Sequence, residues 1–153
     1  QRNQGLKYRG MIDLDRAVED IAMTIEKLKS HTFYNGKIGV IGFCMGGTLT
    51  YLAATRLEID AAVSYYGTQI QEHLGEGDNI ACPTLLHMGD RDDHVPMKIA
   101  DEIRAALSSN PNITFQRYDA GHAFSNDHRP NFYNQSASYA AHARTLKVFG
   151  RLQ

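Results

Sequence analysis

The sequence of 153 residues contains no tryptophan, only two cysteines and only four prolines. Two cysteines are too few for the disulfide framework of a small secreted domain, so a reducing cytoplasm is the expected compartment. Neither charge is in excess, because 16 basic residues stand against 17 acidic ones. A chain without a basic field is not expected to bind nucleic acid or anionic lipid.

Long hydrophobic runs are also missing. The apolar stretches are well short of the roughly 20 residues that a membrane-spanning helix needs, so no membrane association is expected. The first residues, QRNQGLKYRG, lack the apolar stretch of a secretory signal. Because residue 1 is glutamine rather than methionine, we expect the chain to be processed or to be part of a longer one. Its length fits a single domain over residues 1–153.

Hydrophobic periodicity predicts alternating helices and strands. Apolar residues recur at helical spacing between residues 13 and 30, and further helices are predicted over residues 45–56, 96–107 and 135–149. Strands are predicted over residues 37–43, 61–67, 84–89 and 112–118. Strands that alternate with helices favour a parallel sheet with helices on both faces.

Two of these segments carry more specific expectations. The apolar strand over residues 37–43 is typical of a strand that is buried on both faces. Residues 69–79, QIQEHLGEGDN, are predicted to form a polar loop between the second and third strands.

A cysteine lies between glycines where the first predicted strand turns into a helix, in Gly42-Phe43-Cys44-Met45-Gly46. The G-x-C-x-G pattern allows a sharp turn with the side chain of Cys44 exposed at its apex. The amino end of the following helix favours a thiolate there. The backbone N–H of Met45 is then placed to bind a developing oxyanion. The simpler alternative is a small buried cysteine.

An acid and a histidine follow the later strands, where sites collect in parallel sheets. Asp92 lies in HMGDRDDHVP and His122 lies in YDAGHAFSND. Nucleophile, acid and histidine come in the chain order of the α/β-hydrolase triad. Asp90 and Asp93 are expected to be solvated or to cap turns.

Other assignments of the reactive side chains remain open. His94 is close enough to a strand end to compete with His122 as the general base, whereas His87 lies inside a strand and is expected in the core. Cys82 precedes Pro83 at the start of a strand and is expected to serve packing. A zinc site from residues of HMGDRDDH would not match a familiar ligand spacing, so no metal is expected.

Four stretches, NGKIGVIGFCMGG, AAVSYYG, LLHMGDRDDHVP and AGHAFSN, resemble the dienelactone hydrolase (carboxymethylenebutenolidase) family of α/β-hydrolases, over nearly the whole chain. The resemblance implies a Cys44-Asp92-His122 triad that opens an ester or enol-lactone through a thioester, with no cofactor. It makes a small-molecule substrate the expected partner. The candidate substrate-binding residues are Phe43, Tyr65, Asn126 and Arg129.

The chain departs from the family pattern at two places. Asn126 stands where family members place an arginine four residues after the histidine, so another ester or lactone could be the substrate. The family's N-terminal strands, which bring the second oxyanion donor, are not found. A catalytically weak C-terminal fragment that acts as an interaction module is therefore the rival hypothesis. An open edge of the strand over residues 37–43 would then favour a homodimer or another association.

Overall fold

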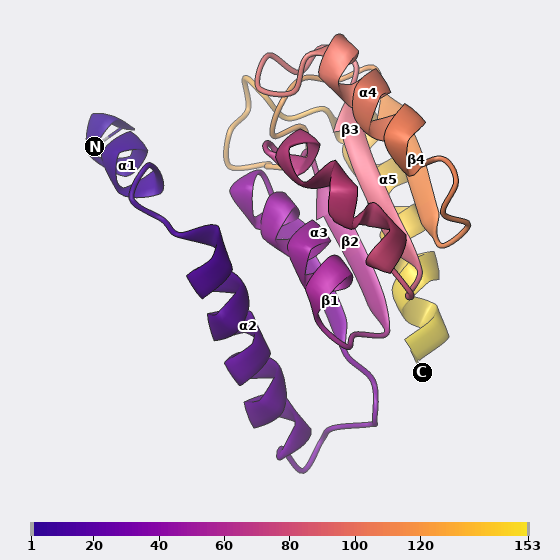
Figure 1. Cartoon of the computed structure of the whole chain (residues 1–153). Helices are drawn as coiled ribbons and strands as arrows, with labels where there is room; N and C mark the ends of the chain where they lie inside the picture. Colours follow the sequence, from indigo (N-terminus) through magenta and orange to yellow (C-terminus); the bar gives the residue numbers. More distant parts are fainter. Residues whose placement is uncertain (1, 153) are drawn as a thin grey trace. The chain divides into compact units, whose positions relative to one another are not determined.

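The computed structural model describes residues 2–152 and divides into two compact units, Gln1–Tyr34 and Asn35–Gln153. The first unit contains α1 (Arg2–Arg9) and α2 (Leu14–Lys29) (Figure 1). The carboxylate of Asp13 caps α2 by accepting hydrogen bonds from two backbone amides of its first turn. The helix predicted over residues 13–30 is confirmed, whereas α1 was not expected because its sequence shows no apolar periodicity.

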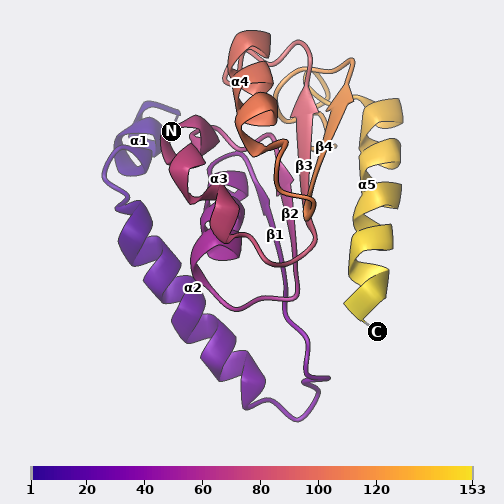
Figure 2. The same cartoon turned by 45° about the vertical axis from the view of Figure 1, so that its right-hand side comes forward.

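The second unit is built on a parallel sheet in which four strands pair in sequence order. Its strands are β1 (Gly39–Phe43), β2 (Ala61–Tyr65), β3 (Thr84–Gly89) and β4 (Ile113–Tyr118). One face carries α3 (Met45–Arg56), η1 (Ile70–Asn79) and α4 (Met97–Leu107), while α5 (Gln135–Phe149) lies on the other (Figures 1 and 2). A short turn of helix, η2 (Gly150–Leu152), follows α5. The predicted parallel sheet with helices on both faces is confirmed.

The core lies on both sides of the central strands. Every residue of β2 and β3 is buried. On the α5 side, Val63 and Leu85 join Phe124 and Ala141 in one hydrophobic cluster. Burial of these strands fixes the positions of their carboxyl ends, where the reactive side chains lie.

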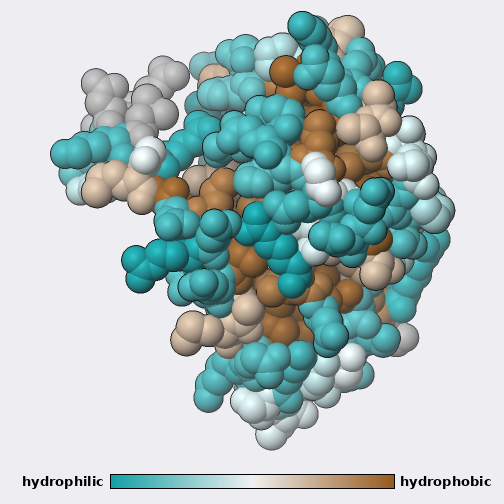
Figure 3. Space-filling view, viewed as in Figure 1, coloured by the Kyte–Doolittle hydropathy of each residue, from teal (hydrophilic) through white to brown (hydrophobic). Residues whose placement is uncertain are grey.

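β1 is an edge strand, and the prediction that both of its faces are buried was wrong. Within residues 2–152 it pairs with β2 alone. Ile41 is 44% exposed and Phe43 is 48% exposed. Hydrophobic side chains reach the surface at several places on the face drawn in Figure 3. An apolar run identifies a strand but does not distinguish a central strand from an edge.

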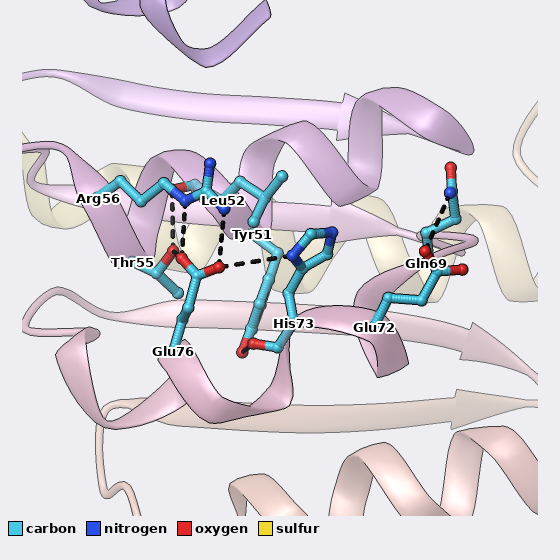
Figure 4. A network of polar contacts seen from close by, with 8 residues as sticks. All are labelled: Tyr51, Leu52, Thr55, Arg56, Gln69, Glu72, His73 and Glu76. Carbon is cyan, nitrogen blue, oxygen red and sulfur yellow. Dashed lines mark hydrogen bonds and ion pairs between the residues drawn. The ribbon is translucent and has the colours of Figure 1, made fainter. Parts of the chain in front are cut away.

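The segment predicted as a polar loop is instead the 3₁₀ helix η1, so this prediction was also wrong. Polar contacts with α3 hold it (Figure 4): the guanidinium of Arg56 donates two hydrogen bonds of 2.7 Å to the carboxylate of Glu76. The hydrogen bond from Arg56 is the main cause that lowers the pKa of Glu76 to about 2. The Tyr51 hydroxyl donates to the carbonyl of His73 over 3.1 Å. Because these contacts are non-local, the segment's own sequence does not predict them.

Candidate active site

Cys44 occupies a strained position between β1 and α3. Its φ of 55° and ψ of −121° are uncommon for a residue with a side chain, and such strain costs roughly 1–3 kcal/mol. The turn is held by a hydrogen bond of 3.0 Å from the Cys44 N–H to the carbonyl of Tyr65. The half-buried cysteine is the N-cap residue of α3, where backbone amides lack intrahelical partners. This geometry presents the sulfur to the positive end of a helix.

The glycines around Cys44 have different roles. A Cβ on Gly42 would collide with the backbone of Gly46 and with the Thr50 hydroxyl. A Cβ on Gly47 would lie 2.8 Å from the Ser64 hydroxyl oxygen. Gly46 itself faces open space. The close packing of strand, turn and helix therefore requires Gly42 and Gly47, while Gly46 matters through its backbone.

Asp92 and His122 form a buried pair beyond the ends of β3 and β4. Nδ1 of His122 lies 2.8 Å from Oδ2 of Asp92, and their side chains are 7% and 0% exposed. The other carboxylate oxygen accepts backbone N–H bonds from His94 at 2.8 Å and Val95 at 3.0 Å. Burial raises the pKa of Asp92, but the hydrogen bond from His122, its charge and these amides together lower it below the ordinary value. Asp92 is thus held as a carboxylate and fixes the imidazole.

His122 connects Asp92 to Cys44. Burial alone would lower the pKa of its imidazole, but hydrogen bonds with Asp92 and Cys44, and the charges of both, raise it to about 9. Nδ1 is engaged by Asp92, which leaves Nε2 for the sulfur. An imidazolium between a carboxylate and a thiol favours the thiolate form of the cysteine. The predicted nucleophile, base and acid are therefore brought together in the order that a triad requires.

His94 is the second histidine at this place. Its ring centroid lies 4.3 Å from that of His122, but its bond to Asp92 is made by the backbone N–H rather than by the ring. Of the two histidines, only the ring of His122 is hydrogen-bonded to the carboxylate among the described residues. The side chain of His94 is instead exposed and lies next to the imidazole of His122.

The other reactive residues lie elsewhere. His87 is fully buried, with Nδ1 2.8 Å from the Tyr118 hydroxyl and Nε2 3.2 Å from the Thr145 hydroxyl. The predicted core position is confirmed by this burial, which lowers the pKa of His87 to about 3. Asp90 pairs with Arg117, and its side chain is still 32% exposed, so it is partly solvated as expected.

Cys82 is 8% exposed, with its sulfur 3.7 Å from the Thr84 hydroxyl oxygen. It lies just before β3 begins, away from the strand ends that carry the triad. Burial raises the pKa of its thiol. The packing role predicted for Cys82 is confirmed.

Two candidate substrate-binding residues precede the turns at the ends of β1 and β2. Phe43 is directly before Cys44, is 48% exposed, and contacts the ring of Tyr65 with centroids 4.8 Å apart. Tyr65 is 3% exposed, and its hydroxyl lies 2.7 Å from that of Thr145 on α5. Phe43 thus borders the candidate site, while the buried ring of Tyr65 packs against the ring of Phe43.

Asn126 and Arg129 lie in the loop after His122. The Asn126 side-chain oxygen accepts a backbone N–H bond from His128 over 3.2 Å. The guanidinium of Arg129 lies 4.2 Å from the centroid of the Phe132 ring, and Arg129 is exposed. Both side chains are engaged within their own loop.

Tyr66 is a site residue that the sequence reasoning missed. Its ring lies edge-on to His122 with centroids 4.9 Å apart, and its hydroxyl is 2.9 Å from that of Ser125. The residue is 2% exposed and has a positive φ of 41°. That φ ends the strand alternation, so Tyr66 turns toward the triad. Its position directly before Gly67, at the end of a predicted strand, was the available signal.

Residues 2–152 hold no group of three histidine, cysteine, aspartate or glutamate side chains that could bind a metal ion. In the same part of the chain, no helix combines the length and the apolar character that crossing a membrane demands.

Comparisons with known proteins identify the family of the chain. Residues 4–153 match the sequence model of the dienelactone hydrolase family. The chain belongs to this family. Carboxymethylenebutenolidase 1 of Cupriavidus pinatubonensis is 31% identical over 153 residues, which are 100% of this chain and 65% of that protein. Carboxymethylenebutenolidase of Pseudomonas sp. strain P51 is 34% identical, again over 100% of this chain and over 64% of the relative. The chain therefore spans about 65% of the length of these curated relatives.

A solved structure shows the shared fold. The crystal structure of a Klebsiella pneumoniae protein assigned as a dienelactone hydrolase superimposes with a TM-score of 0.83 at 24% identity. The match covers 90% of this chain and 61% of that one. The chain thus has the α/β-hydrolase-like fold of that protein.

Proposed function

We propose that the chain hydrolyses a small ester or enol-lactone through a thioester on Cys44. The observation that carries this proposal is the placement of His122 between the carboxylate of Asp92, at 2.8 Å, and the sulfur of Cys44. Membership of the dienelactone hydrolase family supports it, as do curated relatives that are named carboxymethylenebutenolidases. No cofactor takes part in the proposed reaction.

The first half-reaction is attack of the Cys44 thiolate on the carbonyl carbon. Its negative charge passes to the carbonyl oxygen, where the N–H of Met45 at the start of α3 donates a hydrogen bond. The C–O bond to the leaving oxygen then breaks, and His122 supplies the proton that this oxygen needs. With an ester, an acyl thioester on Cys44 and a free alcohol result; with an enol-lactone, the new enol group stays on the acyl chain.

Water completes the reaction. His122 accepts a proton from water as the oxygen attacks the thioester carbonyl, and the C–S bond breaks to release a carboxylic acid and regenerate Cys44. Asp92 does not exchange protons in this scheme but orients the imidazole and stabilises its charged form. One water is consumed and one ester bond is opened.

The substrate is expected to carry a good leaving group. A thiolate is itself a good leaving group, so the tetrahedral intermediate goes forward only when the other group leaves more easily. Activated esters and enol-lactones meet this condition, and simple amides do not. We assign Phe43 to the substrate wall, supported by Tyr65 beneath it. Asn126 and Arg129 are proposed to contact the far end of the substrate, with a neutral hydrogen bond from Asn126.

Trapping of the acyl-enzyme tests this proposal. Intact and tryptic mass spectrometry after mixing with p-nitrophenyl acetate should find one acetyl group on Cys44. Cys82→Ala is the matched control and should acetylate normally, because Cys82 is a buried packing residue. Cys44→Ala should neither acetylate nor release p-nitrophenol above the background rate. Acetylation of Cys82, or turnover by Cys44→Ala, would contradict the proposal.

A second candidate function is a weakly active or inactive hydrolase fragment that serves in association. The exposed Ile41 and Phe43 on edge strand β1 favour it. Loss of one oxyanion donor would reduce the rate on the order of 10²–10³. Under this hypothesis the chain pairs through β1 with a second copy, and acetylation of Cys44 is slow or absent.

The proposal treats residues 1–153 as one partial hydrolase domain. Because the reaction needs a reduced Cys44, a reducing compartment such as the cytoplasm suits it.

A further inference from the structure

A cavity lined by none of Cys44, Asp92 and His122 lies between the sheet and α5. Its volume is about 330 Å³, at the lower end of the range for small-molecule sites. Leu85 at the beginning of β3 and Thr114 and Gln116 on β4 line one side, and Val148 of α5 lines the other. Figure 2 shows α5 running beside these strands.

Three basic side chains border this cavity. Arg144 and Lys147 are three residues apart on one face of α5, and Arg151 lies in the turn η2 that follows it; all three line the cavity. No acidic residue lines the cavity. Within residues 2–152, none of the three forms an ion pair with a carboxylate. Their positive charge is therefore not neutralised by the described part of the chain.

The helix dipole explains only part of this arrangement. A basic residue in the last turn of a helix interacts favourably with its carbonyl end, which accounts for Lys147. Arg144 lies earlier in α5, and its guanidinium donates to the Ala140 carbonyl over 3.0 Å and stands 5.7 Å from the centroid of the Tyr118 ring. These contacts fix the guanidinium, which keeps further N–H donors for a ligand.

We infer that this cavity binds a small organic anion. The basic rim fits a carboxylate, sulfonate or phosphate group, since arginine suits the geometry of such oxyanions. Leu85 and Val148 fit a compact apolar body, and the side chains of Thr114 and Gln116 add hydrogen-bonding groups. The ligand is expected to differ from the substrate at Cys44, because the cavity is lined by other residues of the chain. None of Cys44, Asp92 and His122 lines the cavity.

An NMR titration of the 153-residue chain tests the inference with two probes of similar shape. The anion is 1-naphthalenesulfonate, which has no ester bond, and the neutral control is 1-naphthalenemethanol. The sulfonate should shift the backbone amides of Leu85 and Thr114 with a Kd on the order of 1 mM. The neutral probe should bind about tenfold more weakly.

Variants locate the charge that matters. Arg144→Gln should weaken sulfonate binding about tenfold, with unchanged circular dichroism as the check on folding. Arg104→Gln on α4 is the matched control, since Arg104 does not line the cavity, and it should bind as the wild type does. Cys44→Ala should also bind normally, because the site is independent of the proposed hydrolysis.

Three results would overturn the inference. They are equal binding of the two naphthalenes, shifts that map to β1 and Cys44 instead of Leu85 and Thr114, and an absence of saturable shifts. Normal sulfonate binding by a folded Arg144→Gln protein would show that the charge of Arg144 does not contribute to binding, which also contradicts the inference.

Discussion

The imidazole of His94 lies against that of His122, with ring centroids 4.3 Å apart, while the Nδ1 of His122 alone faces the carboxylate of Asp92. His94 follows β3 and His122 follows β4, so both could be general bases on the basis of sequence. Their partners distinguish them, because a base needs a group that orients it and stabilises its charged form. His94 offers its ring to solvent and its backbone N–H to Asp92.

Replacement of each histidine should therefore have unequal effects. His122→Ala is expected to lower kcat/KM for p-nitrophenyl acetate on the order of 10²–10⁴, since it removes proton transfer. His94→Ala should lower it by less than about tenfold, because only a neighbouring wall is lost. Steady-state kinetics of both variants make the comparison. Equal losses, or the larger loss in His94→Ala, would exchange the roles assigned to the two rings.

Stability should depend on the His122 proton in a defined pH window. The pKa of His122 rises from the ordinary 6.5 to about 9 in the folded protein. A raised pKa means that the folded state binds the proton more tightly, so the stabilisation is complete below about pH 6.5 and is lost between pH 6.5 and 9. Asp92, whose pKa is lowered, stabilises above its ordinary value and loses this effect as acid protonates it.

Urea unfolding of the wild type and of His122→Gln measures this dependence. The difference in free energy of unfolding should be largest near pH 6 and should shrink toward pH 9. His128→Gln is the matched control, because the His128 side chain is 95% exposed in the same loop, and it should follow the wild type at every pH. A difference that stays constant across the window would mean that the His122 proton is not linked to folding.

The two glycines that flank Cys44 should respond in opposite ways to alanine. Gly42→Ala is expected to destabilise the fold by about 3 kcal/mol, because its methyl group would meet the Gly46 backbone. Gly46→Ala should be neutral or stabilise by about 0.5–1 kcal/mol, since Gly46 faces open space in the first turn of a helix. Thermal unfolding of both variants decides between them, and a strongly destabilised Gly46→Ala would require another role for that residue.

The elbow was predictable because its information is local. A strand, two glycines and a helix stand in one stretch of sequence around Cys44, and the chain order of acid and histidine follows from the parallel topology. The helix α3 was predictable for the same reason, and its observed bounds, Met45–Arg56, are the predicted ones.

The failures have non-local causes. The helix η1 depends on Arg56 and Tyr51 of α3, which contact Glu76 and His73 across the sequence. The exposure of β1 depends on which strands pair beside it, and the apolar sequence of a strand does not show which strands those are. Tyr66 was missed because a positive φ, set by the turn after β2, reverses the side that strand alternation would give.

Cys44 and Cys82 should differ in their reaction with iodoacetamide. Burial raises the pKa of the Cys82 thiol, which keeps it protonated and unreactive, whereas Cys44 is half-buried at a helix N-terminus beside His122. Brief alkylation at neutral pH, followed by tryptic mass spectrometry, should find the label on Cys44. The modification should be slower in His122→Ala. Preferential labelling of Cys82 would contradict the assignment of the nucleophile.

Two copies of the chain are expected to associate through edge strand β1. An edge strand with unpaired N–H and C=O groups and exposed apolar side chains is a template for another strand, and native edges are protected by charge. Ile41 is 44% exposed on this strand, so a lysine there costs little packing but blocks an apolar contact between two copies. Two β1 strands meeting across a two-fold axis would continue the sheet antiparallel.

Light scattering at micromolar concentration should therefore give a dimer for the wild type and a monomer for Ile41→Lys. Met97→Lys on α4, where Met97 is 50% exposed, is the matched control and should remain a dimer. A wild-type monomer with cooperative unfolding would refute pairing through this edge, because an unprotected apolar strand would then be stable alone.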